Sequence, residues 1–280
     1  MPVRLLTRFA ILMLALILCA PCAKAESAMN LLLIGVDAAG ADETGRSDTM
    51  ILARADPQRG EVRMVSFLRD LYVQVDGAGH TRLNAAYAHG GEELLKSTLE
   101  QLFGVEIHRT ITVDFDLLKQ LVDDLGGIDV EITEKERQAL NALLKDHGAD
   151  CTLSQAGLQR LNGIQTLCYS RIRKLDSDFQ RTSRQQAVIT AMLHSAAEMD
   201  VWQQLRLALR YLPQLNTDMT LGDIAALLPM LADAGSLRFR TAQVPFEGAY
   251  SDEVIHGMMV LAPDLPLNRT KLTMFLNGEE

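Results

Sequence analysis

The sequence lacks the short motifs that identify several large enzyme classes. It has no Walker-type loop ending in Gly-Lys, no zinc-site spacing of cysteine and histidine, and no Ser-His-Asp arrangement. These absences argue against a nucleotide-binding loop, zinc chemistry and a serine hydrolase. The chain of 280 residues also has no internal repeat and no low-complexity linker, so we expect a single domain with a substantial core.

Basic residues are in the minority. The chain has 27 Lys and Arg against 36 Asp and Glu, which gives a formal charge of −9. Binding to nucleic acid needs a basic surface that neutralises phosphates, so no nucleic-acid partner is expected. Any cationic site must be a local cluster.

Residues 1–25 have the pattern of a signal peptide or signal anchor. Arg4 and Arg8 precede the apolar run Phe9–Ala20, and Ala23-Lys24-Ala25 resembles a cleavage site. A membrane-spanning helix needs about 20 apolar residues, so the short run favours cleavage over retention. We therefore expect an extracytoplasmic protein, secreted or membrane-associated at the cell envelope.

Cysteine is scarce outside this leader. Cys19 and Cys22 lie in the leader, which leaves Cys151 and Cys168. An exported protein with two cysteines is a candidate for one disulfide, here between Cys151 and Cys168. The alternative is a pair of separate buried thiols.

Strand and helix patterns alternate along residues 28–278, with a hairpin near the start. The run Met29–Asp37 is apolar on both faces and predicts a central strand. We expect an α/β fold, a single domain with a mixed central β-sheet flanked by helices on both faces. Further strands are expected over 50–55, 62–68, 110–115, 128–132 and 236–244, and helices over 92–103, 116–125, 134–146, 181–199, 201–212 and 221–232.

The segment Leu167–Gln186 concentrates positive charge in this acidic chain. Its first half alternates like a strand, which would place Arg171 and Arg173 on one face. Its second half predicts a helix, capped by Ser177 or Asp178, with a shared face for the residues Arg181, Arg184 and Gln185. Planar guanidinium groups bind phosphate oxygens in pairs, so the segment suits a pyrophosphate. The alternative is a solvated charged loop with local ion pairs.

Acidic residues follow the first predicted strands. Asp37 and Asp48 flank the loop after the first strand, and carboxylates beside a phosphate site commonly hold Mg²⁺ or Mn²⁺. Arg46 and the pair Arg69-Asp70 lie at strand ends, so Asp48 or Asp70 could accept a proton from an attacking hydroxyl. Taken singly, these residues could also be loop caps and surface ion pairs.

Eight segments resemble the LytR-CpsA-Psr (LCP) family of cell-wall glycopolymer ligases, which are phosphotransferases. They are Asn30-Leu-Leu-Leu-Ile-Gly-Val-Asp37, Gly45-Arg-Ser-Asp-Thr-Met50, Val65-Ser-Phe-Leu-Arg-Asp70, Leu83-Asn-Ala-Ala-Tyr-Ala-His-Gly-Gly91, Leu125-Gly-Gly-Ile-Asp-Val130, Leu161-Asn-Gly-Ile-Gln-Thr-Leu167, Tyr169-Ser-Arg-Ile-Arg173 and Arg181-Thr-Ser-Arg-Gln-Gln186. The segments keep the family's order up to about residue 192, and the match weakens after Asp200.

The resemblance implies an enzyme that moves a glycopolymer phosphate from a polyprenyl-pyrophosphate carrier to peptidoglycan, at the outer face of the cytoplasmic membrane. By the same resemblance, Asp37 and Asp48 would hold Mg²⁺ or Mn²⁺, and Asp48 or Asp70 would accept the proton. Arg46 would also belong to the catalytic residues. The pyrophosphate would be bound by Arg46, Arg69, Arg171, Arg173, Arg181 and Gln185.

Two features depart from the family pattern. Leu68 stands where the family usually has proline before the Arg-Asp pair, and the leader looks cleavable where most members keep an anchor. Two other functions are compatible with the same residues: a hydrolase that gives the pyrophosphate to water, and a non-catalytic binder of prenyl phosphates or anionic glycans. The metal-binding acids favour the enzyme, because a binder needs only the arginines.

Overall fold

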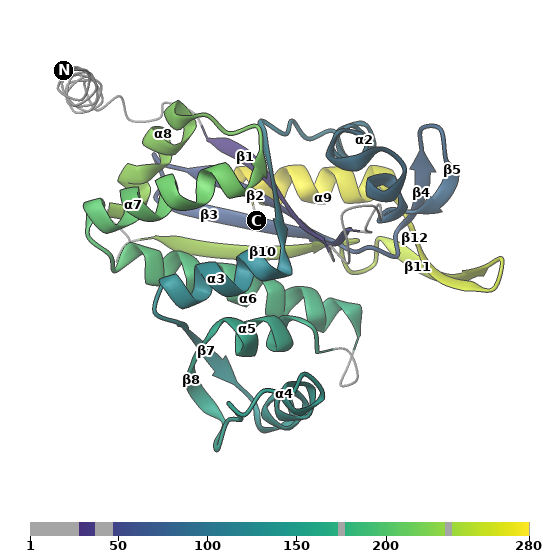
Figure 1. The fold of residues 1–280 in the computed structure, drawn as a ribbon. Helices are drawn as coiled ribbons and strands as arrows, with labels where there is room; N and C mark the ends of the chain where they lie inside the picture. The colour runs from purple at the N-terminus through teal and green to yellow at the C-terminus, as the bar shows by residue number, and fades with distance from the viewer. Residues whose placement is uncertain (1–27, 37–46, 173–176, 233–236, 280) are drawn as a thin grey trace, which may run out of the picture.

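A computed structural model describes residues 28–36, 47–172, 177–232 and 237–279 (Figure 1). Its centre is a six-stranded sheet in the order β10-β3-β2-β1-β6-β9. The strands are β1 (Met29–Val36), β2 (Ser47–Asp56), β3 (Glu61–Phe67), β6 (Arg109–Asp114), β9 (Asn216–Thr217) and β10 (Arg238–Val244). β1 pairs antiparallel with β2 and parallel with β6, so the sheet is mixed and β1 is central, as predicted. The β2–β3 hairpin and the edge strand β10 are also confirmed.

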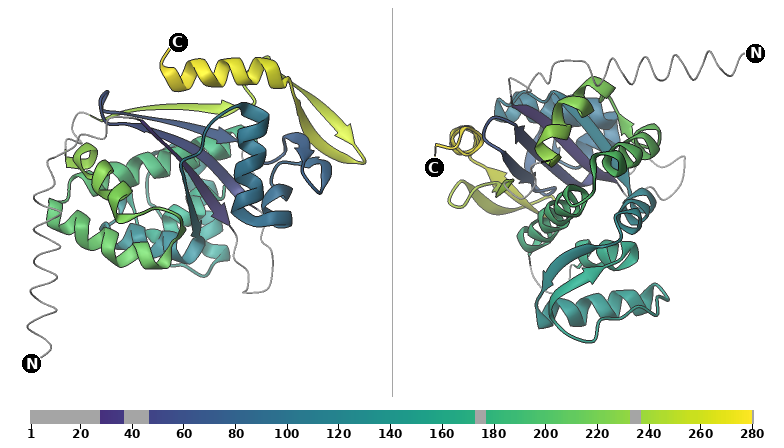
Figure 2. Two further views of the ribbon diagram at one scale, coloured as in Figure 1. Left: turned by 90° about the horizontal axis from the view of Figure 1, so that it is seen from above. Right: turned by 90° about the vertical axis from the view of Figure 1, so that its left-hand side faces the viewer.

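Helices cover both faces of the sheet, which confirms the predicted layered α/β architecture (Figure 2). On one face, α2 (Ala85–Phe103) and α9 (Leu265–Asn277) pack on Leu32, Ile34 and Phe67. On the other face, α6 (Asp178–Ala197) and α8 (Leu221–Ala232) pack on the alternate side chains of the same strands. Strand side chains alternate between faces, so one apolar run supplies both layers.

A smaller lobe lies beside α6 and has its own core. It contains α3 (Phe115–Asp124), β7 (Ile128–Ile132), α4 (Glu134–Asp146), β8 (Gly157–Leu161) and α5 (Gly163–Ser170). β7 pairs with β8 and not with the central sheet. Two further hairpins, β4 (Tyr72–Val75) with β5 (Gly79–Arg82) and β11 (Tyr250–Ile255) with β12 (Met258–Pro263), were not expected from the sequence.

The predicted strand that was to carry Arg171 and Arg173 is wrong. The structure has a helix here, α5, and Arg171 is its C-cap residue. Asn162 and Gln165 form a reciprocal capping box that starts this helix, with 3.0 Å from the Gln165 N–H to the Asn162 side chain.

Within the described ranges, no helix combines the length and apolar character needed to cross a bilayer. The expected leader, residues 1–25, lies outside these ranges.

Candidate active site

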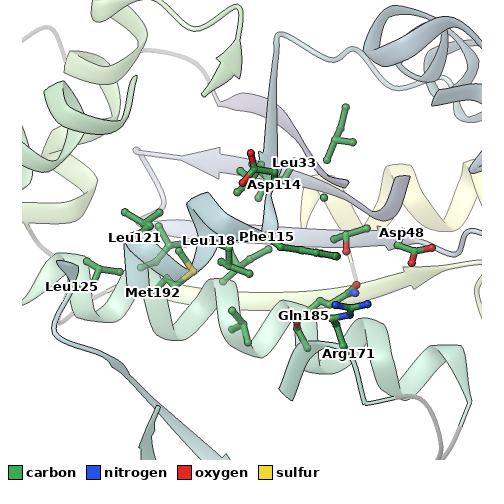
Figure 3. A pocket seen from close by; sticks show the side chains of 18 of the residues that line it. Leu33, Asp48, Asp114, Phe115, Leu118, Leu121, Leu125, Arg171, Gln185 and Met192 are labelled. Carbon is green, nitrogen blue, oxygen red and sulfur yellow. The ribbon is translucent and has the colours of Figure 1, made fainter. Parts of the chain in front are cut away.

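An apolar groove with a charged mouth lies where the lobe meets the central sheet (Figure 3). Its cavity volume is about 300 Å³. The floor comes from the ends of β1, β2 and β6, and the walls come from α3 and α6. The apolar lining consists of Leu33, Ile34, Val113, Phe115, Leu118, Leu121, Leu125, Val188, Ile189, Met192, Leu193, Ala196 and Leu207.

The helical periodicity of α6 explains why its side chains form a wall of the groove. Gln185, Val188 and Met192 recur at three- and four-residue intervals, so they face the same groove. β1 and β6 are parallel and end side by side, with Val36 paired to Asp114. Because ligand sites in α/β proteins lie beyond the carboxyl ends of strands, this arrangement places the groove at such an edge.

The mouth of the groove is formed by polar side chains from three elements. They are Asp48 at the start of β2, Arg171 at the end of α5, and Arg181 and Gln185 on α6. The Arg171 guanidinium lies 4.8 Å from the centre of the Phe115 ring, a cation–π contact that orients it. Arg181 is only 2% exposed, and its Nη2 donates to the backbone carbonyl of Asp48 at 3.4 Å. A buried guanidinium beside an apolar groove is suited to a lipid-linked anion.

Arg69 holds the acidic side of the mouth together. Its Nη1 lies 3.0 Å from the Asp48 carboxylate and its Nε 2.9 Å from Asp178. Burial alone would lower the pKa of Arg69, but Asp178, Asp48 and Asp70 outweigh it and raise the pKa above its ordinary value. Arg69 therefore stays charged and fixes the position of Asp48.

Asp70 lies behind this mouth and does not line the groove. Its carboxylate is 3.7 Å from Arg69 and 3.3 Å from Arg82. Burial, together with the neighbouring Asp178, raises the pKa of Asp70 above its ordinary value although Arg69 and Arg82 act to lower it. Of the two acids predicted as proton acceptor, Asp48 is the one that reaches the groove.

The structure brings together Asp48, Arg171, Arg181 and Gln185 as predicted, with Arg69 next to them. It does not place Arg184 with them: Arg184 is 4% exposed and pairs with Glu136 of the lobe at 2.9 Å, which corrects the expected shared face. Asp37, Arg46 and Arg173 lie outside the described residues.

The predicted disulfide is not present. Cys151 and Cys168 are free thiols, and burial raises the pKa of Cys168. Both cysteines belong to the lobe core, where they behave as small apolar residues.

Leu68 fits the position where the family usually has proline. It is 1% exposed, and its N–H donates to the Val244 carbonyl at 2.9 Å, a bond that proline could not make. Arg69 nevertheless reaches Asp48, so the substitution leaves this ion pair in place.

Two acids in this region had no assigned site role in the sequence. Asp178 binds Arg69 and also Arg181, at 3.3 Å. Asp114 lines the groove, and its side chain accepts the Leu117 N–H at 2.7 Å to cap α3. Their positions in the sequence could have indicated a place at the site. Asp114 ends a strand parallel to β1, and Asp178 starts the helix that carries Arg181 and Arg184.

The described part of the chain contains no group of three or more metal-binding side chains. Asp48 is the only one of the two predicted metal ligands that is described. Magnesium usually binds one or two carboxylates together with substrate phosphates and water, so a single carboxylate at the mouth is compatible with it.

Comparison with known proteins identifies the family. The sequence matches the LytR_cpsA_psr family over residues 17–272. The chain belongs to this family. The match covers every residue of the groove and its mouth.

Named relatives include teichoic acid transferases. The chain is 32% identical to the polyisoprenyl-teichoic acid–peptidoglycan teichoic acid transferase TagU of Oceanobacillus iheyensis over 256 residues, 88% of this chain and 75% of that protein. It is 33% identical to the corresponding transferase TagV of Bacillus subtilis over 175 residues, 59% of this chain and 42% of that protein. Over the first three relatives, the match spans 42% to 63% of their length.

Solved structures share the fold of this LCP protein. The structure named TagT bound to LIIa-WTA has a TM-score of 0.74 at 25% identity, covering 91% of this chain and 92% of that one. A structure of YwtF (TagT) with bound octaprenyl pyrophosphate lipid has a TM-score of 0.69 at 23% identity, covering 91% and 92%.

Proposed function

We propose that this protein transfers a glycopolymer phosphate from a polyprenyl-pyrophosphate carrier to a hydroxyl of peptidoglycan. The observation that carries the proposal is the groove, which is apolar along α6 and ends at Arg171, Arg181 and Asp48. A substrate with a long hydrocarbon tail and a diphosphate head matches this groove, because its tail is apolar and its head is charged. The names of the relatives support the choice of glycopolymer and acceptor.

Different groove residues bind the tail and the head of the substrate. Val188, Met192 and their neighbours contact the prenyl chain, and each buried CH₂ contributes about 0.8 kcal/mol. Arg171 and Arg181, with the Gln185 amide, bind the diphosphate oxygens. By family resemblance, we assign Arg46 and Arg173 to the same head group.

The reaction is an in-line displacement at the phosphorus that carries the glycan. The acceptor hydroxyl oxygen forms the new P–O bond, the bond to the bridging oxygen breaks, and polyprenyl phosphate leaves. We assign Asp48 as the acceptor of the hydroxyl proton, with Arg69 holding its carboxylate in place. Arg171 and Arg181 stabilise the negative charge that grows on the leaving phosphate. Asp70 is a positioning residue that acts through Arg69.

We further propose Mg²⁺, or Mn²⁺, as cofactor, held by Asp48 and by Asp37. When bound, the ion would neutralise charge on the diphosphate oxygens. The site would work at the outer face of the cytoplasmic membrane, where the carrier lipid and the cell wall meet.

The substitution Asp48→Asn tests this function. With a radiolabelled polyprenyl-pyrophosphate-linked glycan and peptidoglycan oligomers, we expect transfer to fall by at least about 100-fold, because the proton acceptor and one proposed metal ligand are lost. Lipid binding should persist, because the arginines and the apolar groove remain. Transfer at the wild-type rate would show that the site is misassigned.

Omitting the peptidoglycan oligomers separates transfer from hydrolysis. A transferase should release polyprenyl phosphate only with the acceptor present. Equal release without the acceptor would identify a hydrolase, and lipid binding without release under either condition would identify a binder.

A further inference from the structure

Helix α7 (Val201–Tyr211) presents an apolar face to solvent. Val201, Trp202 and Leu209 are 54%, 57% and 53% exposed. Trp202, Arg206 and Leu209 recur at positions i, i+4 and i+7, so they share one side of the helix. Arg210 lies next to them and is also exposed. Apolar residues with one tryptophan and flanking arginines are typical of helices that lie in a membrane interface.

The same helix borders the apolar end of the groove. Its Leu207 lines the groove, the Gln204 amide donates to the Ala196 carbonyl of α6 at 3.1 Å, and the Tyr211 hydroxyl donates to Asp124 of α3 at 2.6 Å. α7 thus joins the two helices that form the groove walls. Ala196 lies roughly 22 Å along α6 from Arg181, at about 1.5 Å per residue.

We propose that the outer face of α7, formed by Val201, Trp202, Arg206, Leu209 and Arg210, docks on a bilayer that contains anionic lipids. Docking there turns the apolar end of the groove towards the membrane, so a prenyl chain can pass between bilayer and groove without crossing water. This reason for docking rests on the proposed function. The docking itself needs no carrier lipid.

Charge favours a lipid surface as the occupant of this face. The whole chain has a formal charge of −9, which opposes contact with anionic lipid, yet α7 carries Arg206 and Arg210 on its exposed side. Arg210 is paired with Asp124 at 2.7 Å, and Arg206 has no ion pair with any residue that the structure describes. Arg206 is therefore the main cationic contact.

The start of β1 lies at the same end of the molecule. Figure 1 shows β1 beginning beside α8, and Leu31 packs in one cluster with Leu227 and Met230 of that helix. The apolar sequence Phe9–Ala20 precedes β1. A membrane segment there would hold the α7 end of the domain towards the bilayer.

Trp202 is the only tryptophan in the chain, so its fluorescence reports on this face alone. The exported protein would be mixed with vesicles of phosphatidylcholine, with and without phosphatidylglycerol, and no polyprenyl lipid. We expect a blue shift of the emission and quenching by brominated phosphatidylcholine, both stronger with phosphatidylglycerol. A retained N-terminal segment would itself tether the protein to the vesicles, so the assignment of the signal to the α7 face rests on variants of that face.

Matched variants test the assignment of the face. Leu209→Asp should raise the lipid concentration for half-maximal shift roughly ten-fold, and Arg206→Gln about five-fold. Met259→Asp is the control: Met259 is 74% exposed on the distant β11–β12 hairpin, so the same change should leave the Trp202 response at the wild-type level.

Three outcomes would overturn the proposal. Trp202 emission could stay unchanged with both vesicle types. Leu209→Asp and Met259→Asp could weaken the response equally. The blue shift could instead follow protein concentration without vesicles, together with a doubled mass in sedimentation, which would make this face a dimer interface. None of these outcomes depends on transfer activity, so the docking and the proposed function can fail separately.

Discussion

Gln185, which we propose binds the diphosphate, should make the unliganded protein less stable. Its Oε1 is buried at the groove mouth with no hydrogen-bond partner among the described residues. A buried unsatisfied oxygen costs about 1 to 3 kcal/mol. We predict that Gln185→Met raises the free energy of unfolding by about 1 kcal/mol in urea titration and lowers the affinity for octaprenyl pyrophosphate in calorimetry.

The adjacent glutamine provides the control for that prediction. Gln186 is 3% exposed, and its amide donates to the Ala242 carbonyl at 2.8 Å, on the side of α6 away from the groove. Gln186→Met should lower stability by about 1 kcal/mol and leave lipid affinity unchanged. If both variants changed stability in the same direction, Oε1 of Gln185 would be satisfied in solution.

The ion pair between Arg184 and Glu136 gives the lobe a predicted pH dependence. Burial would raise the pKa of Glu136, but hydrogen bonds from Thr133 and Arg184 outweigh it and hold the pKa below the ordinary value of 4.5. Because the pKa of Glu136 is lower in the folded protein than in the unfolded chain, the ionised carboxylate stabilises the fold above pH 4.5. This stabilisation is lost as the pH falls from 4.5 through the pKa of the folded protein. We predict that Glu136→Gln costs about 3 kcal/mol at pH 7, because the buried Arg184 guanidinium loses the charge of its carboxylate partner.

Thermal unfolding of wild type and variant between pH 7 and pH 3 checks this prediction. The difference in stability should narrow once the pH falls below 4.5. Glu131→Gln, an exposed position on β7, is the control and should track the wild type throughout. A constant difference across the range would contradict the ion-pair explanation.

At the scale of elements, the close contact between α5 and α3 supports the helix that forms one wall of the groove. A Cβ on Gly163 would lie 2.3 Å from the Lys119 backbone oxygen, and the Gly163 N–H donates to Asp123 at 2.8 Å. We predict that Gly163→Ala forces the helices apart, costs about 3 kcal/mol in urea unfolding and weakens prenyl binding, because α3 carries a groove wall.

Gly222→Ala is the matched glycine control for this contact. The nearest atom to its added Cβ would be the Thr220 hydroxyl at 3.4 Å, and the residue lies in the first turn of α8. Stability should stay equal or rise by up to about 1 kcal/mol. Equal losses in both variants would mean that glycine flexibility, and not helix contact, explains the cost at Gly163.

α5 also shows why the sequence prediction failed at the centre of the arginine segment. The pattern from Leu167 to Arg173 alternates, yet α5 is buried on all sides, so no helical periodicity marks it. The capping box of Asn162 and Gln165 was the signal for a helix start. Tertiary burial decided the structure, and alternation over seven residues was too short to exclude a helix.

At the scale of the whole molecule, the predicted central sheet with helices on both faces is confirmed. The apolar run of β1 predicted a central strand with helices on both sides, and both layers are present. The separate core of the lobe was not predicted, because β7 has the same local pattern as a strand of the main sheet. Only the long-range pairing distinguishes the two, and local pattern does not encode it.

The groove lies between the main sheet and the lobe, so a bound lipid should link their stability. It contacts β1 and β6 on one side, and α3 and α6 on the other. At a lipid concentration about 100 times the dissociation constant, binding raises the free energy of unfolding by about 2.7 kcal/mol. We predict that octaprenyl pyrophosphate slows amide exchange in the ends of β1 and β6 and in α3 and α6, and leaves the β11–β12 hairpin unchanged. Hydrogen-exchange mass spectrometry with and without the lipid measures this; slowing confined to one side of the groove would show that the lipid does not bridge the two.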